Sequence, residues 1–206
     1  MTKTTKVQIG LTQFIEFSTK GSSAKLNAVR KIKYQDDYQP AKDYWKQLRD
    51  GIIKFHEENL DLEFFDYLLE GIDEKKKKNY KHSISQYLSF IKKRNIEWFS
   101  PGKSAWFTDD FSVRSSPELG LIIDGEPHLV KLYFKGKSEK IDIRNIKSTL
   151  TLLSSSTYDK SHQPSVNKSV LNLQNKKLYI NSELNEELLL ALKSEAGQFM
   201  FLWNNI

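Results

Sequence analysis

Two apolar runs that meet at a tight-turn dipeptide constrain the fold of this chain more than any other feature. The runs are Leu119–Ile123 and Leu129–Phe134, and Asp124-Gly125 lies between them. Asp and Gly tolerate the positive φ angles of a two-residue hairpin turn, and β-branched and aromatic residues favour the flanking strands. We therefore predict a β-hairpin over residues 118–135. The sequence leaves open whether Pro127 widens the loop from two residues to four.

Helical spacing dominates the chain before residue 100. An apolar stripe with steps of four, three and four residues runs from Tyr80 to Ile91, and Asp73 can cap the helix that carries it. Shorter stripes predict two more helices, within residues 44–55 and 62–69. The N-terminal half is therefore expected to be mostly helical.

The pattern changes after the break at Ser100-Pro101-Gly102. A second, shorter hairpin is predicted around Asn175, and helical spacing returns over residues 143–153 and 184–203. We expect an α+β protein in which a helical N-terminal half packs with a C-terminal half of two β-hairpins and two helices. The expected division is a mostly helical basic region, 1–100, and an α+β region, 101–206. Whether the two regions share one core stays open.

Composition removes several classes of function. The chain has no cysteine, which excludes disulfides, thiolate zinc sites and cysteine nucleophiles. Glycine-rich phosphate loops, dinucleotide fingerprints, serine-hydrolase elbows and zinc-protease motifs are also missing. No apolar run approaches the roughly 20 residues of a membrane span. We therefore expect a soluble, cytoplasmic protein with no membrane contact, no bound metal and no cofactor.

The positive charge of the chain is concentrated in one stretch. The net charge is +6, and residues 71–103 alone hold nine Lys or Arg against three acids, which is also +6. Such a patch attracts polyanions, and DNA or RNA are the partners we expect first. The alternative is a solvated helix end. The predicted nucleic-acid contacts are Lys75, Lys76, Lys77, Lys78, Lys81, Lys92, Lys93 and Arg94.

The first hairpin suggests a second chemistry. A Mg²⁺-dependent nuclease needs clustered carboxylates and a lysine, and Asp124, Glu126 and Lys131 resemble the layout of restriction-endonuclease-like enzymes. Glu118 lies nearby in sequence. The required acidic residue two positions before Lys131 is Leu129, so the motif is incomplete. The simpler interpretation makes Asp124 a turn residue. Mg²⁺ is expected only under the nuclease hypothesis.

Two further stretches resemble known families. Lys78–Ile91 resembles the helical core-binding domain of tyrosine recombinases, which implies DNA contact by the lysines around it. The Pro117–Lys135 block and the Glu195–Trp203 ending resemble a group of uncharacterised bacterial proteins. This second resemblance implies a bacterial or phage-related origin and no particular activity.

Three hypotheses follow. We expect a non-enzymatic protein that binds nucleic acid or a nucleoprotein partner through the basic helix. The first alternative is a degenerate nuclease of restriction-endonuclease-like fold. The second is an interaction subunit of a bacterial defence or toxin–antitoxin complex, whose C-terminal helix meets a protein partner or a second copy. That helix is apolar on several faces at Phe199–Trp203, which also fits a last core helix.

Overall fold

The computed structural model describes residues 7–35, 43–136, 142–181 and 183–206. The helices in these ranges are α1 (Leu11–Ser18), α2 (Ser22–Lys33), α3 (Lys46–Glu57), α4 (Phe64–Glu70), α5 (Glu74–Ile91), α6 (Ile143–Ser154) and α7 (Glu186–Asn204). The strands are β1 (Val7–Gly10), β2 (Ile96–Phe99), β3 (Ser104–Phe107), β4 (Phe111–Arg114), β5 (Leu119–Ile123), β6 (Glu126–Tyr133), β7 (Thr157–Tyr158), β8 (Asn167–Asn172) and β9 (Lys177–Asn181).

The molecule is an α+β protein, as predicted. Helices α1 to α5 fill most of the N-terminal half, and the C-terminal half holds hairpins β5–β6 and β8–β9 and helices α6 and α7. The capping carboxylates of Asp73 and Asp142 accept the backbone N–H groups of Lys75 and Arg144, at 2.8 and 2.9 Å. These bonds satisfy N–H groups that the first helical turn leaves unpaired.

The predicted hairpin over residues 118–135 is the centre of the larger sheet. Asp124 and Gly125 have φ angles of 52° and 91°, and Ile123 pairs directly with Glu126, so the loop has two residues despite Pro127. The sheet has the strand order β2-β5-β6-β8-β9. Because β8 is parallel to β6, α6 forms the crossover between them.

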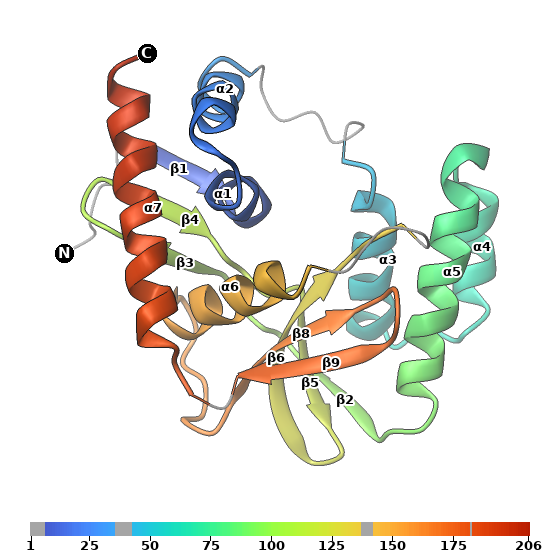
Figure 1. Cartoon of the computed structure of the whole chain (residues 1–206). Coiled ribbons are helices and arrows are strands. Elements are labelled where there is room, and N and C mark those ends of the chain that lie inside the picture. The colour runs from blue at the N-terminus through green and yellow to red at the C-terminus, as the bar shows by residue number, and fades with distance from the viewer. Residues whose placement is uncertain (1–6, 36–42, 137–141, 182) are drawn as a thin grey trace.

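Helices α3, α4 and α5 cover one face of this sheet (Figure 1). The predicted stripe of α5 forms much of their shared cluster, since Tyr80, Ile84 and Tyr87 are buried there against strand residues such as Leu121 and Val130. Each buried aromatic ring removes a large apolar area from water, which holds the helical layer on the sheet.

The smaller sheet has the order β1-β4-β3-β7 and packs with α1, α2 and α7 (Figure 1). Phe14, Phe17, Phe111 and Phe199 are fully buried in this cluster. Helix α2 buries Val29 here. The α2 residue Lys25 donates to both carboxylate oxygens of Glu195 on α7, at 2.8 and 2.6 Å.

Helix α6 contributes side chains to both sheets. Leu152 belongs to the cluster of the smaller sheet, while Ile146, Leu150 and Leu153 pack against Val170 of the larger one. The two main clusters each draw residues from both sides of residue 100. The division into 1–100 and 101–206 therefore does not separate two sets of core residues, and as a domain boundary it stays a prediction.

Candidate nucleic-acid interface

The residues predicted to form a nuclease site, Asp124, Glu126 and Lys131, do not come together. Asp124 lies in the turn and Glu126 begins β6, whereas Lys131 lies five residues further along that strand. At about 3.3 Å per residue, Glu126 and Lys131 are about 16 Å apart along the strand, and alternation points them to opposite faces. One metal ion cannot contact all three residues.

The two acidic residues of the predicted trio, Asp124 and Glu126, each lie next to another group of the protein. The carboxylate of Asp124 accepts the backbone N–H of Asn95 at 2.9 Å, which ties the turn to the start of β2. Glu126 is 71% exposed in its side chain, and its Oε2 lies 3.9 Å from Nε2 of His128. Asp124 is therefore a turn residue, as the simpler interpretation expects.

Lys131 instead pairs with Glu118. Its Nζ donates to Oε1 of Glu118 at 2.5 Å and to the backbone carbonyl of Ser116 at 2.7 Å, while Oε2 of Glu118 accepts the N–H of Leu132 at 2.8 Å. The negative charge of Glu118 is thus already compensated. Within the described ranges of the chain, no group of three or more acidic or histidine residues could hold a metal ion.

His128 is a core residue. Its Nδ1 shares a 2.8 Å hydrogen bond with the hydroxyl of Ser169, and both side chains are buried. Burial lowers the pKa of His128, and the nearby Glu126 only partly opposes this. Because Ser169 is fully buried, its hydroxyl cannot contact a substrate. His128, Ser169 and Glu126 therefore form no accessible site.

The predicted nucleic-acid contacts at the start of α5 fall into two groups. Lys77 is engaged by Glu74 at 2.5 Å, and the Nζ of Lys76 lies 5.4 Å from the centre of the Tyr44 ring. The other three are exposed, have no side-chain partner in the part of the chain that the structure describes, and recur every three residues: Lys75, Lys78 and Lys81.

The cations at the other end of α5 form a separate group. Lys92 follows Lys75 by 17 positions, which corresponds to about 25 Å along a helix. Lys92 and Lys93 are exposed, but Arg94 folds back, donating to the carbonyl of Phe90 at 2.6 Å and lying 4.2 Å from its ring centre. The eight predicted cations therefore do not form one continuous patch.

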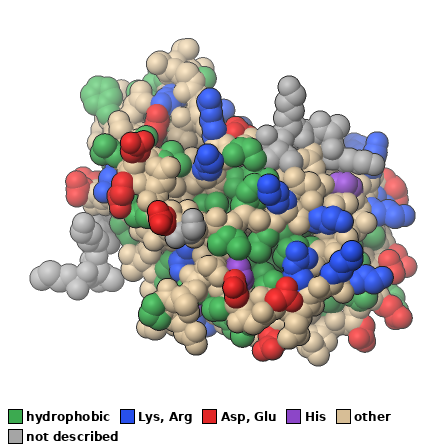
Figure 2. Space-filling model, turned by 60° about the horizontal axis from the view of Figure 1, so that its bottom comes forward, with side chains coloured by type: hydrophobic (Ala, Val, Ile, Leu, Met, Phe, Trp, Pro, Cys, Tyr) green, Lys and Arg blue, Asp and Glu red, His purple; other side chains and the backbone are tan. Residues whose placement is uncertain are grey.

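An acidic segment next to α5 offsets its charge. Residues 57–70 carry six acids and no Lys or Arg, so their charge of −6 cancels the +6 of residues 71–103. This segment includes α4, which packs against α5. Figure 2 accordingly shows basic side chains gathered at the right of the face, with acidic ones along the same edge. Residues 57–103 together therefore contribute nothing to the net charge of the chain.

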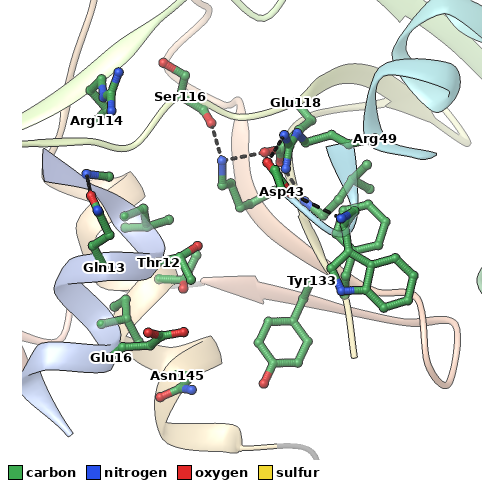
Figure 3. A pocket seen from close by; sticks show the side chains of 18 of the residues that line it. Thr12, Gln13, Glu16, Asp43, Arg49, Arg114, Ser116, Glu118, Tyr133 and Asn145 are labelled. Carbon is green, nitrogen blue, oxygen red and sulfur yellow. Dashed lines mark hydrogen bonds and ion pairs between the residues drawn. The ribbon is translucent and has the colours of Figure 1, made fainter. Parts of the chain in front are cut away.

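The excess belongs to the first 56 residues, which hold eleven Lys or Arg against five acids, and part of it lines a cleft of about 1260 Å³. The start of α1 lies on one side of the cleft and α3 on the other (Figure 3), and the end of α2 also lines it. The connection from β4 to β5, strand β6 and helix α6 supply most of the other lining residues. Its charged lining residues are Arg30, Lys31, Arg49, Arg114, Lys131, Lys135, Glu16, Asp43 and Glu118.

Two of the six lining cations are used in ion pairs. Arg49 donates to Asp43 at 2.7 Å, beside the pair of Lys131 and Glu118 (Figure 3). Burial disfavours the charged form of Arg49, but the hydrogen bond to Asp43 and the nearby acids outweigh it and raise its pKa.

Three other cations of the cleft are not among the contacts predicted from the sequence. Arg30, Lys31 and Arg114 are exposed and have no acidic partner among the described residues. In the sequence, the six acids of residues 57–70 balance the cations of residues 71–103, which leaves the net positive charge in the first 56 residues. Joining Arg114 to α2 requires the three-dimensional fold.

Two buried polar atoms also lie in the wall of the cleft. The hydroxyl of Tyr133 and Oδ1 of Asn145 are shielded from solvent and have no hydrogen-bond partner in the described ranges. Both residues lie below Arg49 and Arg114 in Figure 3. A buried polar atom without a partner lowers stability by about 1–3 kcal/mol, so such atoms are uncommon.

The chain matches no protein-family model and no curated protein. None of the described helices is both long enough and apolar enough to cross a membrane.

Proposed function

We propose that the protein binds nucleic acid by contacting phosphates in the cleft. The observation that carries this proposal is the charge of the lining, six cations against three acids, with Arg30, Lys31 and Arg114 left without an acidic partner among the described residues. Arginine and lysine side chains on a concave surface attract phosphates and release counterions on binding. Such contacts position a nucleic acid without reading its sequence.

The start of α5 is the second candidate surface for the same function. Lys75, Lys78 and Lys81 lie on one exposed side of the helix, but the acids of residues 57–70 reduce the attraction there. The two surfaces can be separated because each carries three exposed cations that take no part in a described ion pair.

The test compares R30Q/K31Q/R114Q with the matched control K75Q/K78Q/K81Q. Binding to labelled DNA and RNA is measured by fluorescence anisotropy from about 50 to 300 mM salt. For the wild type, the logarithm of the affinity should fall steeply with the logarithm of the salt concentration. The cleft variant should lose about two to three units of that slope, since each phosphate contact contributes about 0.7 to 0.9. The α5 variant should keep it.

Other results would change the assignment. If the α5 variant loses the slope and the cleft variant keeps it, the basic helix is the binding surface. No binding of the wild type at low salt rejects the function altogether.

The two alternative functions have less support. A nuclease using Asp124, Glu126 and Lys131 lacks a converging set of carboxylates, and adding Mg²⁺ to the binding assay would test it by cleavage. For an interaction subunit, α7 offers little apolar surface, since Phe199 is in the core and the large side chains Leu190 and Phe201 are the exposed ones along it. The cytoplasmic location and bacterial origin expected from the sequence belong to the same proposal.

A further inference from the structure

Tyr34 is an exposed aromatic side chain beside the cations of the cleft. It follows the last turn of α2, is 69% exposed and lines the cleft together with Arg30 and Lys31. Residues three and four apart lie on the same side of a helix. The ring therefore lies next to both cations, which come four and three residues before it.

The position of Tyr34 is supported from one side by Lys33. Its Nζ donates to the carbonyl groups of Trp203 and Ile206 at 2.7 and 2.6 Å, and it lies 5.9 Å from the centre of the Tyr34 ring. Among the described residues, no other ring stacks on Tyr34. The ring is therefore available to a planar ligand.

The other large aromatic residues of the cleft are not available in this way. Trp45 is stacked between Phe134, at 5.2 Å and 19°, and Tyr80, at 5.5 Å and 11°. These rings belong to the cluster of the larger sheet. An exposed aromatic ring beside unpaired cations is the arrangement that binds an unpaired base and the phosphates next to it.

We propose that the cleft binds single-stranded nucleic acid, with phosphates at Arg30 and Lys31 and an unpaired base stacked on Tyr34. This inference rests on the proposed function and adds the class of nucleic acid. Bases in a duplex are stacked on one another, so a side-chain ring reaches them only when the strand is unpaired.

The chain offers a matched control for the stacking ring. Tyr67 on α4 is also 69% exposed, but it does not line the cleft. The experiment compares Tyr34→Ala, Tyr34→Trp and Tyr67→Ala with the wild type. The probes are a labelled single-stranded DNA of about 20 nucleotides, the same sequence as RNA, and the blunt DNA duplex, at a salt concentration where binding is measurable.

The expected result is specific to single strands. Tyr34→Ala should weaken single-strand binding by about 5- to 100-fold, as the loss of one stacked base does, and should leave duplex binding and the salt slope unchanged. Tyr34→Trp should retain the affinity, and Tyr67→Ala should match the wild type. The DNA and RNA probes show which single strand is preferred.

The failures of the two proposals are distinguishable. If the duplex binds as tightly as the single strand and Tyr34→Ala has no effect, the single-strand inference is wrong, while binding in the cleft stands. If no probe binds the wild type, both proposals fall together.

Discussion

Acid pH should destabilise the fold through His56 on α3. Its Nε2 shares a hydrogen bond with the hydroxyl of the fully buried Tyr87, and its ring stacks on Trp98 at 6.2 Å and 13°. Among the described residues no acidic group compensates a proton there, and burial lowers the pKa of His56 from 6.5 to about 4. The folded protein therefore holds this ring neutral at a pH where an unfolded chain would protonate it.

The magnitude follows from the two pKa values. Above pH 6.5 both states are neutral, and the full stability is present. As the pH falls from 6.5 toward 4, only the unfolded state takes up the proton, so the free energy of unfolding falls by about 1.4 kcal/mol per unit. At pH 4.5 the loss from His56 should be about 2.5 kcal/mol.

The assay is urea denaturation of the wild type and His56→Gln at about pH 7.5 and 4.5, followed by circular dichroism. The glutamine carbonyl can still accept from the Tyr87 hydroxyl but cannot be protonated in this range. We expect the variant to be less stable at neutral pH and to lose about 2.5 kcal/mol less on acidification. His128→Gln serves as a comparison, because burial lowers its pKa too. Equal losses in wild type and His56→Gln would refute the reasoning.

Three substitutions test the packing by the same denaturation measurements. Gly120→Ala should cost more than about 3 kcal/mol, since its Cβ would lie 2.3 Å from the backbone carbonyl oxygen of Phe99; a smaller loss would mean that β2 can move away. Gly197→Ala should raise the stability by about 0.5–1 kcal/mol, because no atom lies within 4 Å of the new methyl group in the middle of α7. Glu118→Gln should cost about 2 kcal/mol by leaving Lys131 without its counter-charge, and an unchanged stability would show that the pair contributes nothing.

Sequence patterns alone predicted the elements whose structure depends on neighbouring residues in the chain. The hairpin follows from the positive φ angles that Asp124 and Gly125 accept, and α5 follows from its stripe and its cap at Asp73. Helix α2 has a weaker pattern, because it is largely polar and buries little beyond Val29. Its stability comes from tertiary packing, which a short window of sequence does not contain.

The sequence did not predict which charged residues lie together, because distance along the chain is a poor guide to distance in space. Asp124, Glu126 and Lys131 are close in sequence, but an extended strand separates them and pairs Lys131 with Glu118 from the neighbouring strand. The cleft, by contrast, is lined by residues that are far apart in the sequence, such as Arg30 and Arg114. The six acids of residues 57–70, which offset the charge of α5, are visible in the sequence.

The contact of the first two helices with the last one also determines when the fold can form. Lys25 and Glu195 are 170 residues apart, and the cluster beneath them needs Phe199 as well as Phe17. Contacts of such large sequence separation must pay for closing a long loop, which slows folding. During synthesis, α1 and α2 therefore leave the ribosome long before their partner exists. The cluster of the smaller sheet can be completed only when α7 has emerged from the ribosome. The same holds for the part of the cleft that α2 lines.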